Sequence, residues 1–272
     1  MILAKPRLVL AALAILAALP QAKAEEGVLV FGVLIQQSPV QTAERWNPVL
    51  NYLGRKVGVP MRLKMGPTVE RTNAMMASGA FDLVFTNHNF KPEYDTLGLV
   101  TIARWGDRAV QAAIAVLADS PVTRLEDLRG RRVAFPSIHA FLGYAVPSVA
   151  LRAAGIDVEE VLAANQEGGL AQLKAGRVDA AAVNSRFLDA FVEREGVAVR
   201  RVYLSDPFPD LAVVAHPRLP AELRDRVRDA LVGMRSDQEA AEMLARCGCP
   251  GFTAATDRDY DGVRAVYRQA SR

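Results

Sequence analysis

The sequence predicts an α/β protein of two lobes, each a mainly parallel sheet flanked by helices, with a ligand cleft between them. The first observation is an internal repeat: Gly, Asp and Asn recur at the same offsets in residues 79–87 and 176–184, with an apolar run between Asp and Asn. The second is that a helix-like stretch precedes each glycine and a buried strand pattern follows it. Alternating strands and helices favour parallel strands with right-handed crossovers.

Each repeat closes a unit of the form β-α-β-α-β. The strands are expected at 28–34, at 62–65 and after Gly79 in the first unit, and at 132–135, at 161–163 and after Gly176 in the second. Helical patterns lie between them. From residue 219 onward the pattern is helical, over 221–235, 236–246 and 257–270, and these helices are expected to pack on the first lobe.

The repeat also predicts where the chain passes between lobes. The first lobe is expected to comprise residues 28–111 and 206–272, and the second lobe residues 112–205. The 248 residues that remain after 24 are removed from 272 are enough for two modest lobes, each with its own core.

Polar side chains follow the predicted strands at their carboxyl ends, where parallel α/β sheets bind ligands. The candidate ligand-binding residues at or just after these ends are Gln36, Ser38, Thr68, Thr86, Asn87, His88, Asn89, Ser137, His139, Tyr144, Gln166 and Asn184. The amides in this set suit a ligand that presents both donors and acceptors.

Two of the three histidines fall at predicted strand ends, one in each unit. His88 and His139 form a cross-cleft pair for an anion or a metal-containing ligand in one interpretation, and bond locally in the other. Weaker candidates are Glu70, Arg71 and Glu167, which are expected in first helical turns, where a carboxylate favours the helix dipole.

The amino terminus is typical of a cleavable signal peptide over residues 1–24. Lys5 and Arg7 precede an apolar run at 8–19, and a small-x-small pattern ends at Ala24. The sequence therefore predicts a periplasmic protein, with a retained membrane anchor as the alternative. Removal of residues 1–24 takes away three basic side chains and no acidic ones, which changes 33 basic and 30 acidic residues to 30 of each. A neutral chain gives no reason to expect nucleic acid as a partner.

Enzyme motifs are not found in the sequence: it contains no G-x-S-x-G elbow, HExxH pair, phosphate-binding glycine loop or dinucleotide fingerprint. We therefore expect a binding protein without cofactor or resident metal. The two cysteines, Cys247 and Cys249, allow a strained local disulfide or half of a metal site, but a helix end is the favoured interpretation.

Several short segments carry a family resemblance in their order and spacing. They are residues 30–33, 46–53, 79–83, 118–121, 125–130 and 133–135, together with the signal peptide. From about residue 28 to about residue 216 the chain resembles the phosphate-, phosphite- and phosphonate-binding periplasmic proteins of ABC transporters. The resemblance implies a type II periplasmic binding protein fold, hinge closure on a solute, and delivery to an ABC permease. We expect a monomer; a sensor that docks on a membrane histidine kinase is the alternative function.

The chain departs from the family pattern at the loop that holds phosphonate oxygens. The family has a Ser-Thr-Ser-Gly-Tyr run there, whereas Ala140, Phe141 and Leu142 precede Gly143 here. Gln166 replaces a histidine frequent in the family. Three lost donors at about 1 to 3 kcal/mol each predict weak or no binding of phosphate and alkylphosphonates. A small polar solute or another oxyanion is the expected ligand, while Phe141 and Tyr144 either line an organic ligand or pack the helix.

Overall fold

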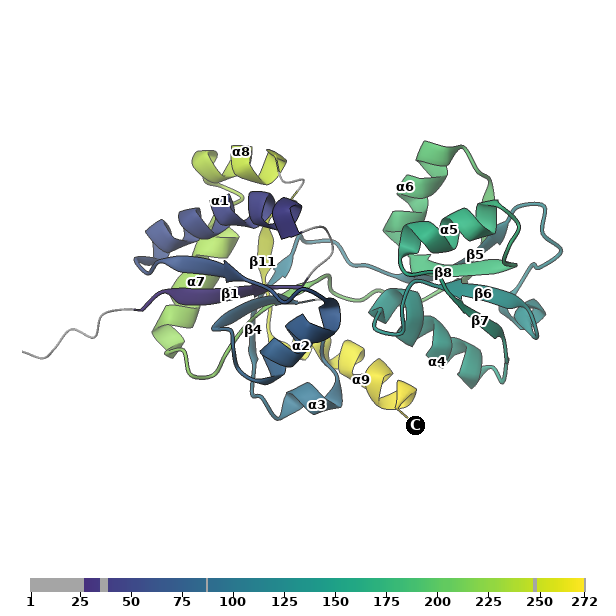
Figure 1. The fold of residues 1–272 in the computed structure, drawn as a ribbon, viewed down its shortest axis with the longest axis horizontal. Coiled ribbons are helices and arrows are strands. Elements are labelled where there is room, and N and C mark those ends of the chain that lie inside the picture. Colours follow the sequence, from purple (N-terminus) through teal and green to yellow (C-terminus); the bar gives the residue numbers. More distant parts are fainter. Residues whose placement is uncertain (1–26, 35–38, 87, 247–248, 272) are drawn as a thin grey trace, which may run out of the picture.

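The computed structural model describes residues 27–34, 39–86, 88–246 and 249–271. The predicted signal peptide, the candidate residues Gln36, Ser38 and Asn87, and Cys247 lie outside these ranges. The described residues form two lobes side by side, joined by two connections (Figure 1). Within the described ranges, no helix has both the length and the apolar composition that a membrane crossing needs.

The first lobe contains a six-stranded sheet in the order β11-β4-β10-β3-β1-β2. Its strands are β1 (Leu29–Val33), β2 (Met61–Lys64), β3 (Leu83–Thr86), β4 (Val100–Trp105), β10 (Ala212–Ala215) and β11 (Phe252–Ala254). Its helices are α1 (Pro39–Val57), α2 (Val69–Ala77), α3 (Pro92–Asp95), α7 (Ala221–Gly233) and α8 (Gln238–Arg246). Strand β1 pairs in parallel with β2 and β3, and β10 runs antiparallel to β3 and β4.

The second lobe contains a five-stranded sheet in the order β7-β6-β8-β5-β9. Its strands are β5 (Ala112–Leu117), β6 (Arg132–Phe135), β7 (Glu159–Leu162), β8 (Ala180–Asn184) and β9 (Val199–Leu204). Its helices are α4 (Val146–Ala153), α5 (Gln166–Lys174) and α6 (Ser185–Glu195). A 3₁₀ turn (Leu125–Leu128) precedes β6, and a π-helical turn (Phe141–Ala145) leads into α4.

The predicted repeat is confirmed: β1-α1-β2-α2-β3 and β6-α4-β7-α5-β8 have the same order and the same parallel pairing. The prediction of mainly parallel sheets needs a correction, because both sheets are mixed. Strands β4, β10 and β11 extend the first sheet with antiparallel pairs, and β5 and β9 do so in the second. These strands lie outside the repeated units: β4 and β5 flank the first connection between lobes, β9 and β10 flank the second, and β11 follows α8.

The recurring glycines and aspartates of the repeat are structural. Gly79 and Gly176 end α2 and α5 with φ of 70° and 66°, the left-handed conformation that glycine adopts without a Cβ penalty. The carboxylate of Asp82 then accepts a hydrogen bond from the N–H of Val30 at 2.7 Å. In the second unit, Asp179 accepts from the N–H of Arg132 at 2.9 Å. Each aspartate thus ties the start of a third strand to the first strand of its unit.

The chain passes between the two sheets twice, between Trp105 and Ala112 and between Leu204 and Ala212. The lobe boundaries proposed at 111/112 and 205/206 lie at or within these connections, and as boundaries of independent units they stay a prediction. Helices α7 and α8 pack on α1, as expected. The last helix, α9 (Asp261–Ala270), follows a 3₁₀ turn (Asp257–Tyr260) and contacts α3 of the first lobe and α4 of the second. The prediction that α9 packs on the first lobe is therefore incomplete, because α9 also packs on the second lobe.

An aromatic cluster fills the first lobe between α1 and the sheet. Trp46 lies at its centre, with its ring 4.8 Å from that of Phe85 and 5.4 Å from that of Phe31. Trp105 packs on Phe85 at 5.1 Å, and Phe252 meets Trp105 edge-on at 5.5 Å. Because Trp46, Phe85 and Trp105 also reach the space between the lobes, the core of this lobe and one wall of the cleft are the same structure.

Candidate functional site

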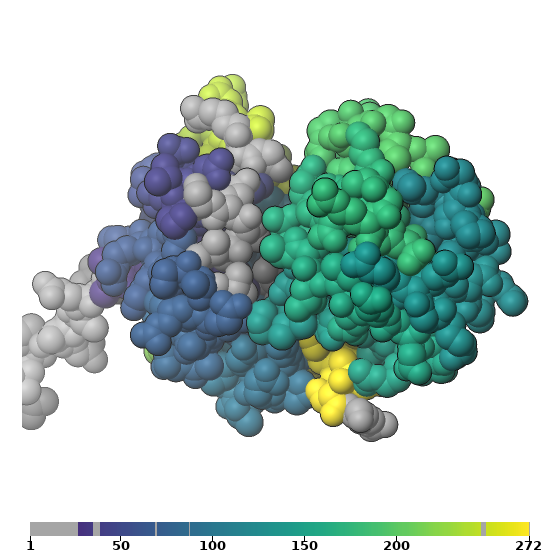
Figure 2. Space-filling view, turned by 45° about the vertical axis from the view of Figure 1, so that its right-hand side comes forward, coloured from purple at the N-terminus to yellow at the C-terminus, as the bar shows by residue number. Residues whose placement is uncertain are grey.

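A cleft of about 760 Å³ lies between the two lobes. The lobes meet along a furrow on the face shown in Figure 2, with α9 at its lower end. The first lobe lines the cleft with Val33, Leu34, Thr42, Arg45, Trp46, Phe85, His88 and Trp105. The second lobe lines it with residues 136–137, 139–143, 164–167, 184 and 186–187. Asp210 and Leu211, from the second connection, and Tyr267 of α9 complete the lining. Most of these positions follow the carboxyl ends of β1, β3, β6, β7 and β8, as parallel sheets predict.

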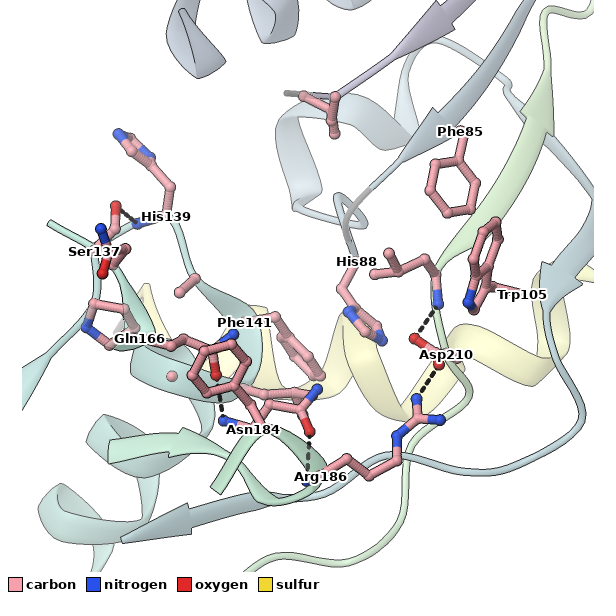
Figure 3. Close-up of a pocket in the computed structure, with 18 of the residues that line it drawn as sticks. Phe85, His88, Trp105, Ser137, His139, Phe141, Gln166, Asn184, Arg186 and Asp210 are labelled. Carbon is pink, nitrogen blue, oxygen red and sulfur yellow. Dashed lines mark hydrogen bonds and ion pairs between the residues drawn. The ribbon is translucent and has the colours of Figure 1, made fainter. Parts of the chain in front are cut away.

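The cleft brings together several of the sequence-predicted residues. They are His88, Ser137, His139, Gln166 and Asn184, and Figure 3 shows them around one space. Ligand contact by these side chains stays a prediction. Three of them come from strand ends that adjoin in the second sheet, so the order β7-β6-β8 places them together.

Other predicted residues lie away from the cleft. Thr68 caps α2, where its Oγ1 accepts a hydrogen bond from the N–H of Arg71 at 3.2 Å. Thr86 follows Phe85 on β3, and because successive strand residues point to opposite faces, it lines a separate small cavity together with Asn89. Asn89 donates to Asn73 at 2.8 Å.

Tyr144 also lies outside the cleft. Its hydroxyl donates to Glu160 at 3.1 Å, and its ring packs edge-on against Phe135 at 5.3 Å. Of the two interpretations of Phe141 and Tyr144, helix packing describes Tyr144, whereas Phe141 lines the cleft while also being buried.

His88 connects three parts of the molecule. It follows β3, its Nε2–H donates to the carbonyl oxygen of Pro209 at 2.7 Å, and its ring stacks on Phe141 of the second lobe at 4.8 Å. Because a carbonyl can only accept, Nε2 carries the proton. The side chain is buried, and burial lowers the pKa of His88, although Pro209 and the nearby Asp210 oppose that shift. His88 is thus a neutral imidazole at the junction of the lobes.

His139 lies across the cleft entrance from α2. Its Nε2 is 3.4 Å from a carboxylate oxygen of Glu70, so the pair joins the second lobe to the first. Hydrogen bonds from its own backbone N–H and from Thr68, with a smaller contribution from His139, lower the pKa of Glu70. The side chain of Glu70 is 64% exposed and that of His139 is 34% exposed, so this contact adds little to the stability of the fold.

Three amides of the second lobe each accept one backbone hydrogen bond through the side-chain oxygen. Gln166 accepts from the N–H of Asn184 at 2.8 Å, and Asn184 accepts from the N–H of Arg186 at 3.0 Å. Asn165 accepts from the N–H of Gly168 at 2.7 Å as the cap of α5. Each oxygen has a second lone pair, so these side chains keep acceptor capacity beside the N–H donors of their NH₂ groups. That this wall suits a ligand with both donors and acceptors stays a prediction.

A half-buried ion pair links the second lobe to the second connection. Arg186, in the first turn of α6, pairs with the carboxylate of Asp210 (Figure 3). The other oxygen of Asp210 accepts from the N–H of Leu211 at 2.8 Å, and its carbonyl accepts from the hydroxyl of Tyr260 at 2.5 Å. The loop that carries Asp210 is thereby fixed to both lobes.

Sequence reasoning missed Arg45, Trp46, Trp105, Arg186 and Asp210 as cleft residues. Trp46 was part of the family resemblance, but nothing in its pattern separates a core side chain from a cleft wall. Arg45 stands one position before it on α1, and Trp105 and Asp210 lie on the two connections. A useful signal would have been the helical spacing of Thr42, Arg45 and Trp46, which places them on one face of α1.

The family whose description is "ABC transporter, phosphonate, periplasmic substrate-binding protein" matches residues 31–260. The chain belongs to this family. The phosphonates-binding periplasmic protein of Escherichia coli K12 is 22% identical over 261 residues, which cover 90% of this chain and 77% of that protein. Members of this family are substrate-binding proteins of ABC transporters and not enzymes.

Two solved structures are similar in fold to this member of the phosphonate-binding family. PhnD1 of Prochlorococcus marinus MIT 9301, in complex with methylphosphonate, has a TM-score of 0.75 at 15% identity and covers 90% of this chain and 99% of its own. XAC2383 of Xanthomonas citri, bound to chloride ion, has a TM-score of 0.78 at 19% identity. The match covers 90% of this chain and 98% of XAC2383. The expected type II periplasmic binding protein fold is confirmed.

This family member starts the helix after β6 with apolar residues. Phe141 and Leu142 are buried, and Phe141 packs against Phe208 at 4.9 Å and Tyr267 at 5.3 Å. An added Cβ at Gly143 would lie 2.4 Å from Cγ of Pro136, so glycine is required for this close approach. The backbone N–H groups at the helix start remain as donors for an anion, since they have no intrahelical acceptor.

The stability of this phosphonate-binding family member is expected to fall between pH 7.5 and 5.5, in part because of His88. Its folded pKa is lowered by burial, so the unfolded chain binds the proton more readily, and the stabilisation is lost as the pH falls through the unfolded value of about 6.5. In His88→Phe, which keeps a ring on Phe141, urea unfolding is expected to show a smaller loss over this range. Equal losses of stability between pH 7.5 and 5.5 in wild type and His88→Phe would contradict the assignment.

Proposed function

We propose that this protein collects a small polar solute or oxyanion in the periplasm, closes its two lobes around it, and delivers it to an ABC permease. The observation that carries the proposal is the donor-rich cleft between the lobes. Gln166, Asn184 and Asn165 line one side with amide groups that carry N–H donors, and Arg45 lies on the other. A ligand that bridges these walls would favour the closed arrangement, because it contacts both lobes only there.

The same proposal includes export through a signal peptide at residues 1–24. The basic start, apolar run and small-x-small end support it, as does membership of a periplasmic family. A chain that lacks residues 1–24 is expected to stay in the cytoplasm when it is expressed in a Gram-negative host. Recovery of that shortened chain from the periplasm would contradict this part of the proposal.

Methylphosphonate, the ligand of the Prochlorococcus relative, is expected to bind weakly here. The helix start offers backbone donors but lacks the hydroxyls that the family pattern places at Ala140, Phe141 and Leu142. In isothermal titration calorimetry at neutral pH, submicromolar affinity for methylphosphonate or phosphate would show that the backbone N–H groups suffice.

A small-molecule extract of the source cells tests the proposed function without a choice of ligand. The extract is expected to raise the melting temperature of the purified, ligand-stripped protein, and native mass spectrometry is expected to detect a bound small molecule. If the extract changes neither the melting temperature nor the mass of the protein, a solute-binding role is contradicted. The histidine-kinase alternative predicts the same binding, but then loss of the gene would abolish a transcriptional response and leave solute uptake intact.

A further inference from the structure

One arginine of the cleft lining forms no ion pair with a described residue. Two of its carboxylates have arginine partners: Asp210 pairs with Arg186, and Glu167 pairs with Arg194. Arg45 is the remaining cation of the lining, and no carboxylate of the described residues forms an ion pair with it. The lining thus holds two arginines and two carboxylates, and Arg45, on α1 of the first lobe, is the arginine without an ion-pair partner among the described residues, because Glu167 pairs with Arg194 from outside the lining.

The geometry around Arg45 fixes its guanidinium. The group lies over the ring of Trp105, 5.2 Å from the ring centroid, so the indole supports one of its faces. Its Nε is buried without a hydrogen-bond partner among the described residues. A buried donor without an acceptor is unfavourable, and it indicates that the acceptor comes from outside the described chain.

The surroundings of Arg45 are apolar and aromatic on the first-lobe side. Trp46 and Phe85 line the cleft beside Trp105, and Val33, Leu34 and Leu211 extend the same wall. The opposite wall offers the NH₂ donors of Gln166 and Asn184. A ligand that satisfies both walls carries one anionic, hydrogen-bond-accepting group and an apolar body.

We infer that Arg45 is the anion-binding residue of this site and that the ligand is an organic monoanion with an apolar part, of which a carboxylate is the simplest case. This inference rests on the proposed function and narrows its ligand class. A carboxylate matches the planar fork of a guanidinium with two parallel hydrogen bonds and neutralises its single charge. A dianion would leave one negative charge without a partner in a half-enclosed cleft, which is unfavourable.

Tryptophan fluorescence provides the readout, because both tryptophans of the sequence, Trp46 and Trp105, line the cleft. The probes are benzoate, its uncharged analogue benzamide, the cation benzylammonium and inorganic phosphate. Wild type is expected to bind benzoate at least about tenfold more tightly than the other three probes. Tighter binding of benzamide, benzylammonium or phosphate than of benzoate would overturn the inference.

Arg45→Gln is expected to weaken benzoate binding by about 10- to 100-fold and to leave benzamide binding unchanged. Arg62→Gln is the matched control, since Arg62 is an exposed arginine of the same lobe outside the cleft. If Arg45→Gln does not fold, Arg45→Lys keeps the charge and is expected to retain the preference for benzoate over benzamide while losing part of the affinity. An unchanged benzoate affinity in Arg45→Gln, or no preference for benzoate in Arg45→Lys, would overturn the assignment.

The two proposals fail in different ways. If a solute from the cell extract binds but benzoate does not, or if the bound solute is neutral or cationic, the assignment of Arg45 falls and the solute-binding function stands. If neither the extract nor any probe binds, both fall.

Discussion

Replacement of Trp46 by alanine is expected to lower the free energy of unfolding by about 3 to 5 kcal/mol. Trp46 is only 4% exposed, and its ring contacts Phe31 and Phe85 at the centre of the first-lobe core. Alanine leaves a cavity that the sheet and α1 cannot fill without moving, because interiors are close-packed. Urea unfolding followed by far-ultraviolet circular dichroism measures the loss without relying on the fluorescence of Trp46.

Val40→Ala on the same helix is the matched control. Its side chain is 67% exposed, so the free energy of unfolding is expected to change by less than about 0.5 kcal/mol. A loss of less than about 1 kcal/mol in Trp46→Ala would show that the aromatic cluster is not the main support of this lobe. The substitution is also expected to alter probe binding, since the cavity opens into the cleft wall.

Arg186→Met is expected to lower the free energy of unfolding by about 3 kcal/mol, which is more than the loss expected for Asp210→Asn. The carboxylate side chain of Asp210 is 8% exposed and that of Arg186 is 45% exposed. Without the arginine a buried carboxylate loses its ion-pair partner, which is strongly unfavourable. Asp210→Asn instead leaves an arginine that can turn to water, and its amide oxygen can still accept from Leu211, so a loss of about 1 kcal/mol is expected.

Arg201→Met is the control for Arg186→Met. Arg201 pairs with Asp189 where both side chains are well exposed, and such a pair contributes about 0 to 1 kcal/mol. Equal losses in Arg186→Met and Arg201→Met, measured by urea unfolding at pH 7.5, would show that the Asp210 pair does not fix the connection between lobes.

The sequence by itself determined the repeated unit and its ends. A helix end needs a glycine, and the strand that follows needs an aspartate at its start; Gly79 and Gly176, then Asp82 and Asp179, meet these needs. Because both requirements involve only a few neighbouring residues, they can be recognised in the sequence. The carboxyl ends of the repeated strands followed directly, and with them His88, Ser137, His139, Gln166 and Asn184.

The tertiary structure alone decided which other side chains meet at the cleft. Arg45 and Trp105 are 60 positions apart in the numbering, and they meet because α1 packs over a sheet in which β4 joins through the antiparallel strand β10. Asp210 meets Arg186 because the second connection crosses beside α6. Such contacts depend on strand order and on how the lobes face each other, which residue spacing does not encode. Even the free NH₂ groups of Gln166 and Asn184 depend on which backbone N–H their oxygens reach, and only the folded chain fixes that.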